Sequence, residues 1–272
     1  MAIINNPPYE GTPEDDLFFV SARKIKGRSD ELVSAGAGDD IVYWTVRPDQ
    51  NVTAHLGQGD DVFHSQHIAR RATAEPAPKL KVNGGTGNDI IYGTINADAI
   101  FGGAGDDALF SDPKDYVYVP FEVPDKDIIH GGIGNDLLVG HSQLYGDEGN
   151  DHLVATGTKS SHLFGGKGDD RLDAGGHAGV DLWGEEGADI FAYNRGVVHD
   201  FSAQEGDRLD LPFEVTSIGT EFDPTPGHIW VRTFPRSGVE KIYYTDSTGS
   251  PQLMELLPRG IDIANAELSW FI

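Results

Sequence analysis

A nine-residue unit recurs along the chain and places one aspartate after a run of glycines. The unit has the form G-G-x-G-x-D-x-U-x, where U is a large apolar residue, and complete copies span residues 84–92, 102–110, 131–139 and 165–173. Near copies begin at Ala35, Leu56, Gly93, Gly146 and Gly184, and residues 11–18 form a degenerate copy. So many units in one frame are not a chance pattern, and they indicate a repeat architecture.

The sixth-position aspartates are the residues with clear chemistry. Two unit charges about 5 Å apart repel by roughly 0.8 kcal/mol in water and about 3 kcal/mol at an effective dielectric of 20. A cation between stacked aspartates turns this repulsion into cohesion, and Ca²⁺ takes carboxylate and carbonyl oxygens as ligands. We therefore expect several structural Ca²⁺ ions as the cofactors. The candidate ligands are Asp40, Asp61, Asp89, Asp98, Asp107, Asp127, Asp136, Asp151, Asp170 and Asp189.

The spacing of these aspartates indicates how they pair. Asp89, Asp98 and Asp107 are nine residues apart, and Asp151, Asp170 and Asp189 are nineteen apart, so one coil contains about eighteen residues. We expect calcium between turns that lie two units apart on one edge. One edge is predicted to pair aspartates among Asp89, Asp107 and Asp127. The other edge is predicted to pair Asp136 with Asp151, Asp151 with Asp170 and Asp170 with Asp189. Asp40 and Asp61 are predicted to form an extra pair, which is not assigned to either edge.

This pairing predicts unequal effects of two substitutions. Asp170 is expected to contribute to two adjacent ions, whereas Asp98 has no aspartate partner one coil away in this scheme. Asp170→Ala should therefore damage folding more than Asp98→Ala.

The repeat also specifies the elements that must hold these turns. Glycine adopts positive φ without steric cost, which suits the six turn residues, and the three residues that follow alternate as a short strand. One apolar side chain per strand then points inward between two parallel sheets. The inward residues form a nearly unbroken ladder: Ile91, Ile100, Leu109, Ile129, Leu138, Leu144, Leu153, Leu163, Leu172, Leu182 and Phe191.

The predicted fold is all-β, a right-handed parallel β-roll, which is a β-solenoid of nonapeptide repeats, with a small β-rich C-terminal cap. Residues 1–33 are expected to form an N-terminal cap with a degenerate repeat, and 34–211 the roll, with inserts near 65–79 and 111–126. Residues 212–272 are expected to cap the other end. There the segments Ile229 to Phe234 and Val239 to Thr245 are predicted to pair as a hairpin.

The repeats resemble the RTX (hemolysin-type calcium-binding) repeats found in the C-terminal regions of serralysin-type proteases and the R-modules of alginate epimerases. Residues 198–202 (VHDFS) and 206–211 (GDRLDL) are similar to the stretch that closes the roll in those proteins. The tail from Leu256 to Ile272 resembles their uncleaved C-terminal signal. The resemblance implies type I secretion from a Gram-negative-type bacterium, with the secretion transporter as one partner and an extracellular location.

Composition excludes several other classes. The chain has 44 acidic residues against 20 basic ones, a net charge of −24, so we expect no nucleic-acid partner. There are no cysteines, which excludes disulfide scaffolds and thiolate metal sites. The first eleven residues have no basic and apolar regions of a Sec signal, and we expect no transmembrane segment.

Signatures of catalysis are weak, and we expect no enzyme activity. Residues 140–144 (GHSQL) resemble a lipase elbow, but Leu144 stands where that motif needs glycine, and the repeat frame explains Ser142. No H-E-x-x-H motif occurs, and His64 and His67, the closest histidine pair, lack a third zinc ligand. The carboxylate pairs within the repeats are explained as calcium turns.

Three functions remain open at this stage. The favoured one is a secreted calcium-binding protein with an extracellular structural, adhesive or matrix-binding role, whose partner is a polysaccharide or a cell-surface component. The second is an accessory module of a polysaccharide- or protein-acting secreted enzyme, and the third is a hydrolase with an unrecognised site. The aromatic insert Asp112 to Asp125 is either a carbohydrate or partner contact or a bulge packed on the sheet.

The tail gives a prediction about export. Deleting residues 256–272 removes the predicted C-terminal signal, which emerges last from the ribosome. The truncated protein should therefore stay inside a host that carries the matching type I transporter. Calcium-dependent β structure should stay largely intact in the truncated chain. Immunoblots of cells and medium test this, and truncated protein in the medium would show that the tail is not the signal.

Overall fold

The computed structural model describes most of the repeat region and part of the C-terminal region. The described residues are 2–5, 8–21, 30–46, 51–67, 80–94, 97–112, 127–156, 161–176, 179–192, 196–210, 215, 217–219, 223–234 and 239–254. Most of the two predicted inserts and the whole predicted secretion tail lie outside these residues.

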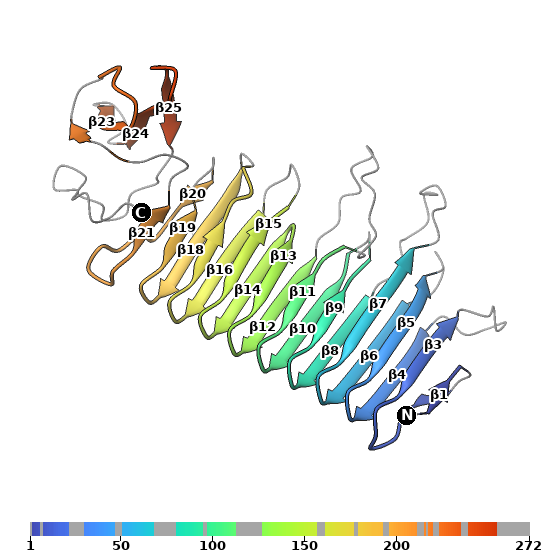
Figure 1. Cartoon of the computed structure of the whole chain (residues 1–272). Coiled ribbons are helices and arrows are strands. Elements are labelled where there is room, and N and C mark those ends of the chain that lie inside the picture. The colour runs from blue at the N-terminus through green and yellow to red at the C-terminus, as the bar shows by residue number, and fades with distance from the viewer. Residues whose placement is uncertain are drawn as a thin grey trace.

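Two parallel sheets run the length of the described repeat region (Figure 1). Sheet A consists of β1 (Ile3–Ile4), β3 (Leu17–Ser21), β5 (Ile41–Val46), β7 (Val62–His67), β9 (Ile90–Tyr92), β11 (Ala108–Phe110), β13 (Leu137–Gly140), β15 (His152–Ala155), β17 (Arg171–Asp173), β19 (Ile190–Ala192) and β21 (Arg208–Asp210). Sheet B consists of β2 (Tyr9–Glu10), β4 (Asp30–Ala37), β6 (Asn51–Gln58), β8 (Leu80–Thr86), β10 (Ala99–Ala104), β12 (Ile128–Ile133), β14 (Gln143–Glu148), β16 (Ser161–Lys167), β18 (Val180–Glu186) and β20 (Val197–Val198).

From β3 onward the chain alternates between the sheets, so each coil contributes one strand to sheet B and the next strand to sheet A. Equivalent repeat positions pair in register, as where Leu109 lies between Ile91 and Leu138. The described residues contain strands and turns without any helix. The predicted parallel β-roll is therefore confirmed.

The two sheets are joined at two different edges. Connections from sheet B to sheet A are short turns that end in a sixth-position aspartate, and we call this side the aspartate edge. Connections from sheet A back to sheet B form the loop edge, where lengths differ. Only two residues, His141 and Ser142, join β13 to β14, whereas residues 111–127 join β11 to β12.

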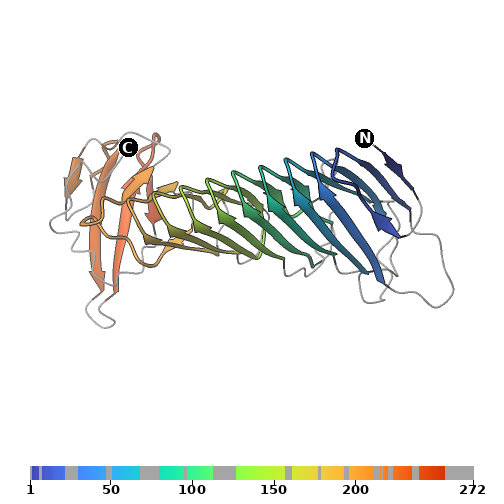
Figure 2. The same ribbon diagram turned by 90° about the horizontal axis from the view of Figure 1, so that it is seen from below.

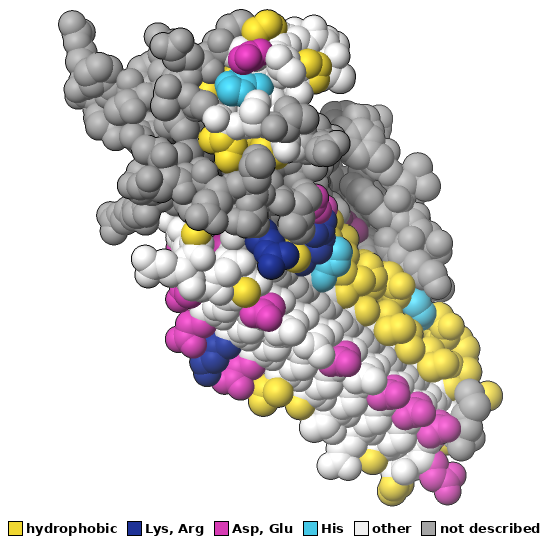
Figure 3. All heavy atoms as spheres, turned by 60° about the vertical axis from the view of Figure 1, so that its left-hand side comes forward, with side chains coloured by type: hydrophobic (Ala, Val, Ile, Leu, Met, Phe, Trp, Pro, Cys, Tyr) yellow, Lys and Arg dark blue, Asp and Glu magenta, His cyan; other side chains and the backbone are white. Residues whose placement is uncertain are grey.

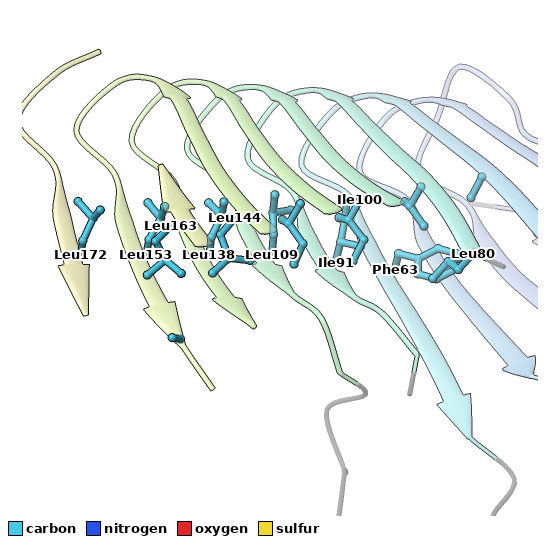
Figure 4. Packing of buried hydrophobic residues seen from close by; sticks show 14 of the residues in the cluster. Phe63, Leu80, Ile91, Ile100, Leu109, Leu138, Leu144, Leu153, Leu163 and Leu172 are labelled. Carbon is cyan, nitrogen blue, oxygen red and sulfur yellow. The ribbon is translucent and has the colours of Figure 1, made fainter. Parts of the chain in front are cut away.

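The core is the predicted apolar ladder between the sheets (Figure 4). All eleven predicted inward residues are fully buried, with 0% exposure. Phe18, Val42 and Phe63 continue the ladder toward the N-terminus, and Leu209 continues it toward the C-terminus. Because each coil adds one layer of apolar side chains, the core is a long column, as the elongated ribbon in Figure 2 shows.

A third sheet follows the roll. It contains β22 (Ser217–Gly219), β23 (His228–Phe234), β24 (Val239–Thr245) and β25 (Pro251–Met254). Strands β23 and β24 pair antiparallel from Ile229 opposite Tyr244 to Phe234 opposite Val239, which confirms the predicted hairpin. Ile229 is fully buried and belongs to the same apolar cluster as Leu209 of the last coil.

The ladder predicts a local cost for truncating one rung. Leu144 is fully buried and lies in register between Ile129 and Leu163, so Leu144→Ala should reduce the free energy of unfolding in calcium by about 2–5 kcal/mol. Gln143→Ala, on the adjacent outward side chain, should change it by less than about 0.5 kcal/mol. Denaturant titration measures both values, and equal losses would contradict the inward assignment.

Candidate calcium sites

Ten aspartates form one continuous column along the aspartate edge. In nine successive contacts the backbone N–H of one aspartate donates to Oδ1 of the aspartate in the next coil, at 2.7–2.9 Å. All ten side chains are buried. The column contains Asp16, Asp40, Asp61, Asp89, Asp107, Asp136, Asp151, Asp170, Asp189 and Asp207.

The second carboxylate oxygen divides this column into an interior and two ends. In the eight interior aspartates, Asp40 to Asp189, Oδ2 is buried and has no hydrogen-bond partner among the described residues. At the N-terminal end, Asp16 Oδ2 accepts the Thr12 N–H at 2.7 Å, and at the other end Asp207 Oδ2 accepts the Ser202 N–H at 2.6 Å. The interior column is therefore a row of buried anions with one unused acceptor each.

Burial raises the pKa of every interior carboxyl. The backbone N–H from the preceding coil acts in the opposite direction, and neighbouring carboxylates raise the pKa further. The pKa is about 6 for Asp40 and Asp136, about 7 for Asp61, Asp107, Asp151 and Asp189, and about 8 for Asp89 and Asp170. Without a cation, the folded chain holds these groups in an environment that disfavours their charge.

Glycine at the first repeat position leaves room beside the unused oxygen. A Cβ added to Gly165 would lie 2.3 Å from Asp170 Oδ2, closer than real side chains approach. Equivalent clashes would occur at Gly84, Gly102, Gly131, Gly146 and Gly184, each with the aspartate five residues on. In the two N-terminal units Ala35 and Leu56 occupy this position. The turns that end at Asp40 and Asp61 therefore carry a side chain where the later turns have only glycine.

The fifth repeat position forms a second, exposed ladder beside the column. Here the side-chain oxygen accepts the N–H of the fifth residue in the following coil, as from Asn88 to Asp60 at 2.7 Å and from Asp106 to Asn88 at 2.7 Å. The ladder continues through Asn135, Asn150 and Asp169. The two ladders donate in opposite directions, and together they hold successive turns in register at both positions.

These features fit a hard cation. The unused Oδ2 atoms supply carboxylate oxygens, and the surrounding turns are backbone-rich, so carbonyl oxygens are the remaining donors, as Ca²⁺ requires. Among the described residues no three Asp, Glu or His side chains converge on one point. Side chains alone therefore do not complete a coordination sphere, and the backbone of the turns has to supply part of it.

The second repeat position separates two kinds of turn. In the eight interior turns of the aspartate edge this residue has positive φ: it is glycine in six of them, while Asp147 has φ 77° and Glu185 has φ 70°. In the turns that end at Asp16 and Asp98 the second residue is threonine, and its N–H donates to the turn's own aspartate. A carboxylate that is bonded within its own turn has less need of a cation.

The structure corrects the predicted edge assignment. Asp107 contacts Asp136, not Asp127, and Asp136 lies on the same edge as Asp89. The error arose in counting units through the 111–126 insert. That insert belongs to the loop edge, so the step from Asp107 to Asp136 spans 29 residues and is still a single coil. The predicted pairs Asp40–Asp61, Asp136–Asp151, Asp151–Asp170 and Asp170–Asp189 are adjacent in the column.

Asp98 and Asp127 lie together on the loop edge. The Asp98 N–H donates to Asp127 Oδ1 at 2.8 Å, so the expectation that Asp98 has no partner one coil away is wrong. Both carboxylate oxygens of Asp98 accept bonds from Thr94, one from its N–H and one from its hydroxyl at 2.9 Å. Burial, and then the nearby Asp127, raise the pKa of Asp98 well above its ordinary value.

His141 lies beside this pair and also near a serine. Its Nε2 is 3.4 Å from Asp127 Oδ2, and its Nδ1 is 3.3 Å from Ser111 Oγ and 3.7 Å from Asp112 Oδ2. These groups have the residue types of a hydrolase triad, but Ser111 is only 1% exposed, so a substrate could not reach its hydroxyl in this arrangement.

Ser142, the serine of the elbow-like segment, joins β13 to β14. Its φ is 85°, and its N–H donates to Ser161 Oγ at 3.2 Å, while the nearby Leu144 is a core rung. The contacts of this segment are those of a tight connection at the loop edge.

Two aspartates of the column, Asp16 and Asp207, were absent from the predicted ligands. Both were detectable, because a large apolar residue stands two places after each aspartate, as at the eighth position of the repeat. This residue is Phe18 after Asp16 and Leu209 after Asp207. In the structure they close the two ends of the column.

The fold and its turns define a class of protein, the parallel β-roll with stacked carboxylates between its coils. The family model described as the RTX calcium-binding nonapeptide repeat matches four segments, residues 81–112, 124–143, 139–157 and 145–176. The chain therefore contains RTX calcium-binding repeats, and these repeats imply that it binds Ca²⁺. No curated protein matches its sequence. The column extends beyond the matched segments, to Asp16, Asp40 and Asp61 at one end and to Asp189 and Asp207 at the other.

The two kinds of turn predict different responses to alanine. Asp170→Ala should raise the calcium concentration needed for half-maximal folding several-fold, because it removes an unused Oδ2 and a bond to Asp151. Asp98→Ala should destabilise the calcium-loaded roll but leave the apparent number of calcium ions unchanged, because both oxygens of Asp98 are bonded to Thr94. Calorimetric calcium titration with parallel circular dichroism measures both quantities. Loss of calcium stoichiometry in Asp98→Ala alone would contradict this distinction.

Proposed function

We propose that this chain is an extracellular, non-enzymatic protein whose roll folds when calcium binds along the eight interior turns of the aspartate edge. The proposed ligands are Asp40, Asp61, Asp89, Asp107, Asp136, Asp151, Asp170 and Asp189. The observation that carries the proposal is the row of buried Oδ2 atoms without hydrogen-bond partners. Calcium would supply the positive charge that makes this row cohesive.

Electrostatics support a folding switch. Folding without a cation brings eight carboxylates from water into a buried column. Their raised pKa values show that the folded chain destabilises the charged form of these groups. Because a metal that binds the folded chain shifts the folding equilibrium, calcium affinity and folding are coupled. Extracellular calcium modules bind at about 10⁻⁴–10⁻³ M, so the chain would stay unfolded at cytosolic calcium and fold outside the cell.

The same architecture supports the proposed structural or adhesive role. The described part of the chain is mostly a rod with a continuous core, and its dominant cluster of ionisable groups is explained by calcium-dependent folding. The described residues include no helix long and apolar enough to cross a membrane. Secretion by the type I route remains part of this proposal, since the tail on which it depends lies outside the described residues.

Calcium titration of the metal-free chain tests the proposal. In chelator at pH 8 the far-ultraviolet circular dichroism should be that of an unfolded chain, and calcium should produce the β-sheet signal cooperatively. Magnesium should be much less effective, because it prefers near-ideal octahedral geometry and keeps several waters. A chain that is already compact in chelator at pH 8 and does not respond to calcium would overturn the folding switch.

The raised pKa values give this experiment a pH dependence with a definite sign. In the unfolded chain an aspartate has a pKa of about 3.9, so between that value and the folded values the metal-free folded state binds more protons. Metal-free stability should therefore be greatest below about pH 4 and decline as pH rises through the folded values of about 6 to about 8.

Calcium and protons should compete for the same carboxylates. Where acidification has folded the metal-free chain, an ion must displace the protons bound by the column, so the calcium midpoint should rise as pH falls further, by about tenfold per pH unit for each proton displaced. In chelator the same acidification should instead increase the folded fraction. A calcium midpoint that does not change with pH while the metal-free chain is folded would contradict the assignment of these carboxylates as ligands.

A further inference from the structure

The outer face of sheet A carries two parallel rows of apolar side chains from β1 to β15. Each sheet A strand presents its first and third residues outward, while its second residue enters the core. One row contains Ile3, Leu17, Ile41, Val62, Ile90, Ala108 and Leu137, and the other contains Phe19, Tyr43, His64, Tyr92, Phe110, Val139 and Val154. We call these fourteen residues the apolar strip.

Three side chains of the apolar strip are exposed and the other eleven are half-buried, and none of them is acidic or basic apart from His64. The first row ends at Leu137, because His152 occupies the equivalent position on β15. Ile3 is 67% exposed, Phe19 43% and Ile90 38%. In Figure 3 a band of hydrophobic side chains, interrupted by histidine, runs along the roll beside the acidic side chains of the turns. In a chain with a net charge of −24, a band of this kind is unusual and marks an interaction surface.

The opposite outer face is different. Sheet B presents Lys81, His130, Asp147, Asp181 and Glu185 outward, and its own aromatic row runs between these charged groups. His130 pairs with Asp147 at 2.9 Å, and His199 pairs with Asp181 at 2.8 Å. Sheet B also exposes apolar side chains, among them Leu32, Ile128 and Ile133, but charged groups are interspersed among them, whereas the apolar strip contains no charged group other than histidine.

Ring geometry indicates which kind of partner the strip suits. Phe19, Tyr43, His64, Tyr92 and Phe110 stack on one another, with centroids 4.7–5.7 Å apart and ring planes within 16° of parallel. Each inner ring has both faces covered by its neighbours and directs an edge outward. A sugar needs an open aromatic face for stacking, and an anionic membrane is repelled by the charge of the chain, so an apolar protein surface is the better match.

We propose that the apolar strip is an interface between two copies of this chain, which pack sheet A against sheet A. Eight strands about 4.8 Å apart and two rows of side chains give a footprint of roughly 34 Å by 14 Å. Two such footprints bury about 1,000 Å², the lower bound for a specific interface, which corresponds to a reversible dimer. The strip is self-complementary, as a two-fold interface requires, because both copies contribute aliphatic groups and ring edges.

The calcium dependence of this dimer rests on the proposed function, in which calcium folds the roll. Association of two chains with a charge of −24 each is opposed by repulsion, and every bound calcium ion removes two negative charges from a chain. The strip also exists only when the roll is folded, because unfolding separates the rows. Dimers are therefore expected in calcium and not in chelator.

Sedimentation velocity of the full chain in saturating calcium tests the inference. We expect a concentration-dependent shift toward twice the mass of 29.4 kDa at micromolar protein. Ile90→Lys, in the middle of the strip, should weaken association at least tenfold. The matched control is Ile128→Lys, since Ile128 also follows an aspartate, begins a strand and is 38% exposed like Ile90, but lies on the outer face of sheet B. This control should dimerise like the wild type.

Circular dichroism in calcium separates the possible failures. A wild-type chain that gains β structure in calcium but stays monomeric at high concentration would overturn the dimer and leave the folding switch intact. Equal effects of Ile90→Lys and Ile128→Lys on association would place the interface elsewhere. Liposome or glycan binding that Ile90→Lys abolishes in a monomeric wild type would also overturn the dimer, because the strip would then serve another occupant.

Discussion

Every coil of this protein places a carboxylate directly against the carboxylate of the next coil, and the rest of the structure has to tolerate that contact. The stacking distance is set by the backbone hydrogen bonds of parallel strands, at about 4.8 Å, and not by the charges themselves. The distance between successive coils cannot increase at the turns, because this would break the hydrogen bonds between neighbouring strands in both sheets. The charges must therefore be neutralised where they stand, by protons or by a cation.

The ends of the column show how the same geometry is managed without a metal. Asp16 accepts N–H groups from Ala2 and Thr12, and these bonds lower its pKa although burial acts to raise it. Asp207 is bonded by Ser202, yet burial still raises its pKa to about 6. At Asp16 the donor Thr12 is the second residue of the turn, and interior turns have positive φ at this position, which directs their peptide differently. At Asp147 and Glu185 this conformation is adopted without glycine, which costs on the order of 1 kcal/mol per residue.

The core and the class of site could be predicted from the sequence because both depend on positions within a single repeat. The apolar residue two places after the aspartate is always an inward rung, whatever the length of the loop that follows. The edge could not be predicted in the same way, since units on both edges have the same form and only the number of coils distinguishes them. One step between stacked aspartates spans 29 residues and the next spans 15, so counting residues misplaced Asp127. Thr94 was the available local signal, because it replaces the glycine that an interior turn uses.

The unequal coil lengths have a consequence for how such a protein changes over time. Steps along the column range from 15 to 29 residues, yet the hydrogen bonds between successive aspartates stay within 2.7–2.9 Å. From Asp16 to Asp189 all of this variation is absorbed on the side of the roll away from the stacked carboxylates, and only the last turn, which ends at Asp207, is itself two residues longer. Insertions and deletions after strands such as β11 or β15 are therefore nearly neutral to folding, and this side can diversify, or display a grafted peptide, while the other side stays constant.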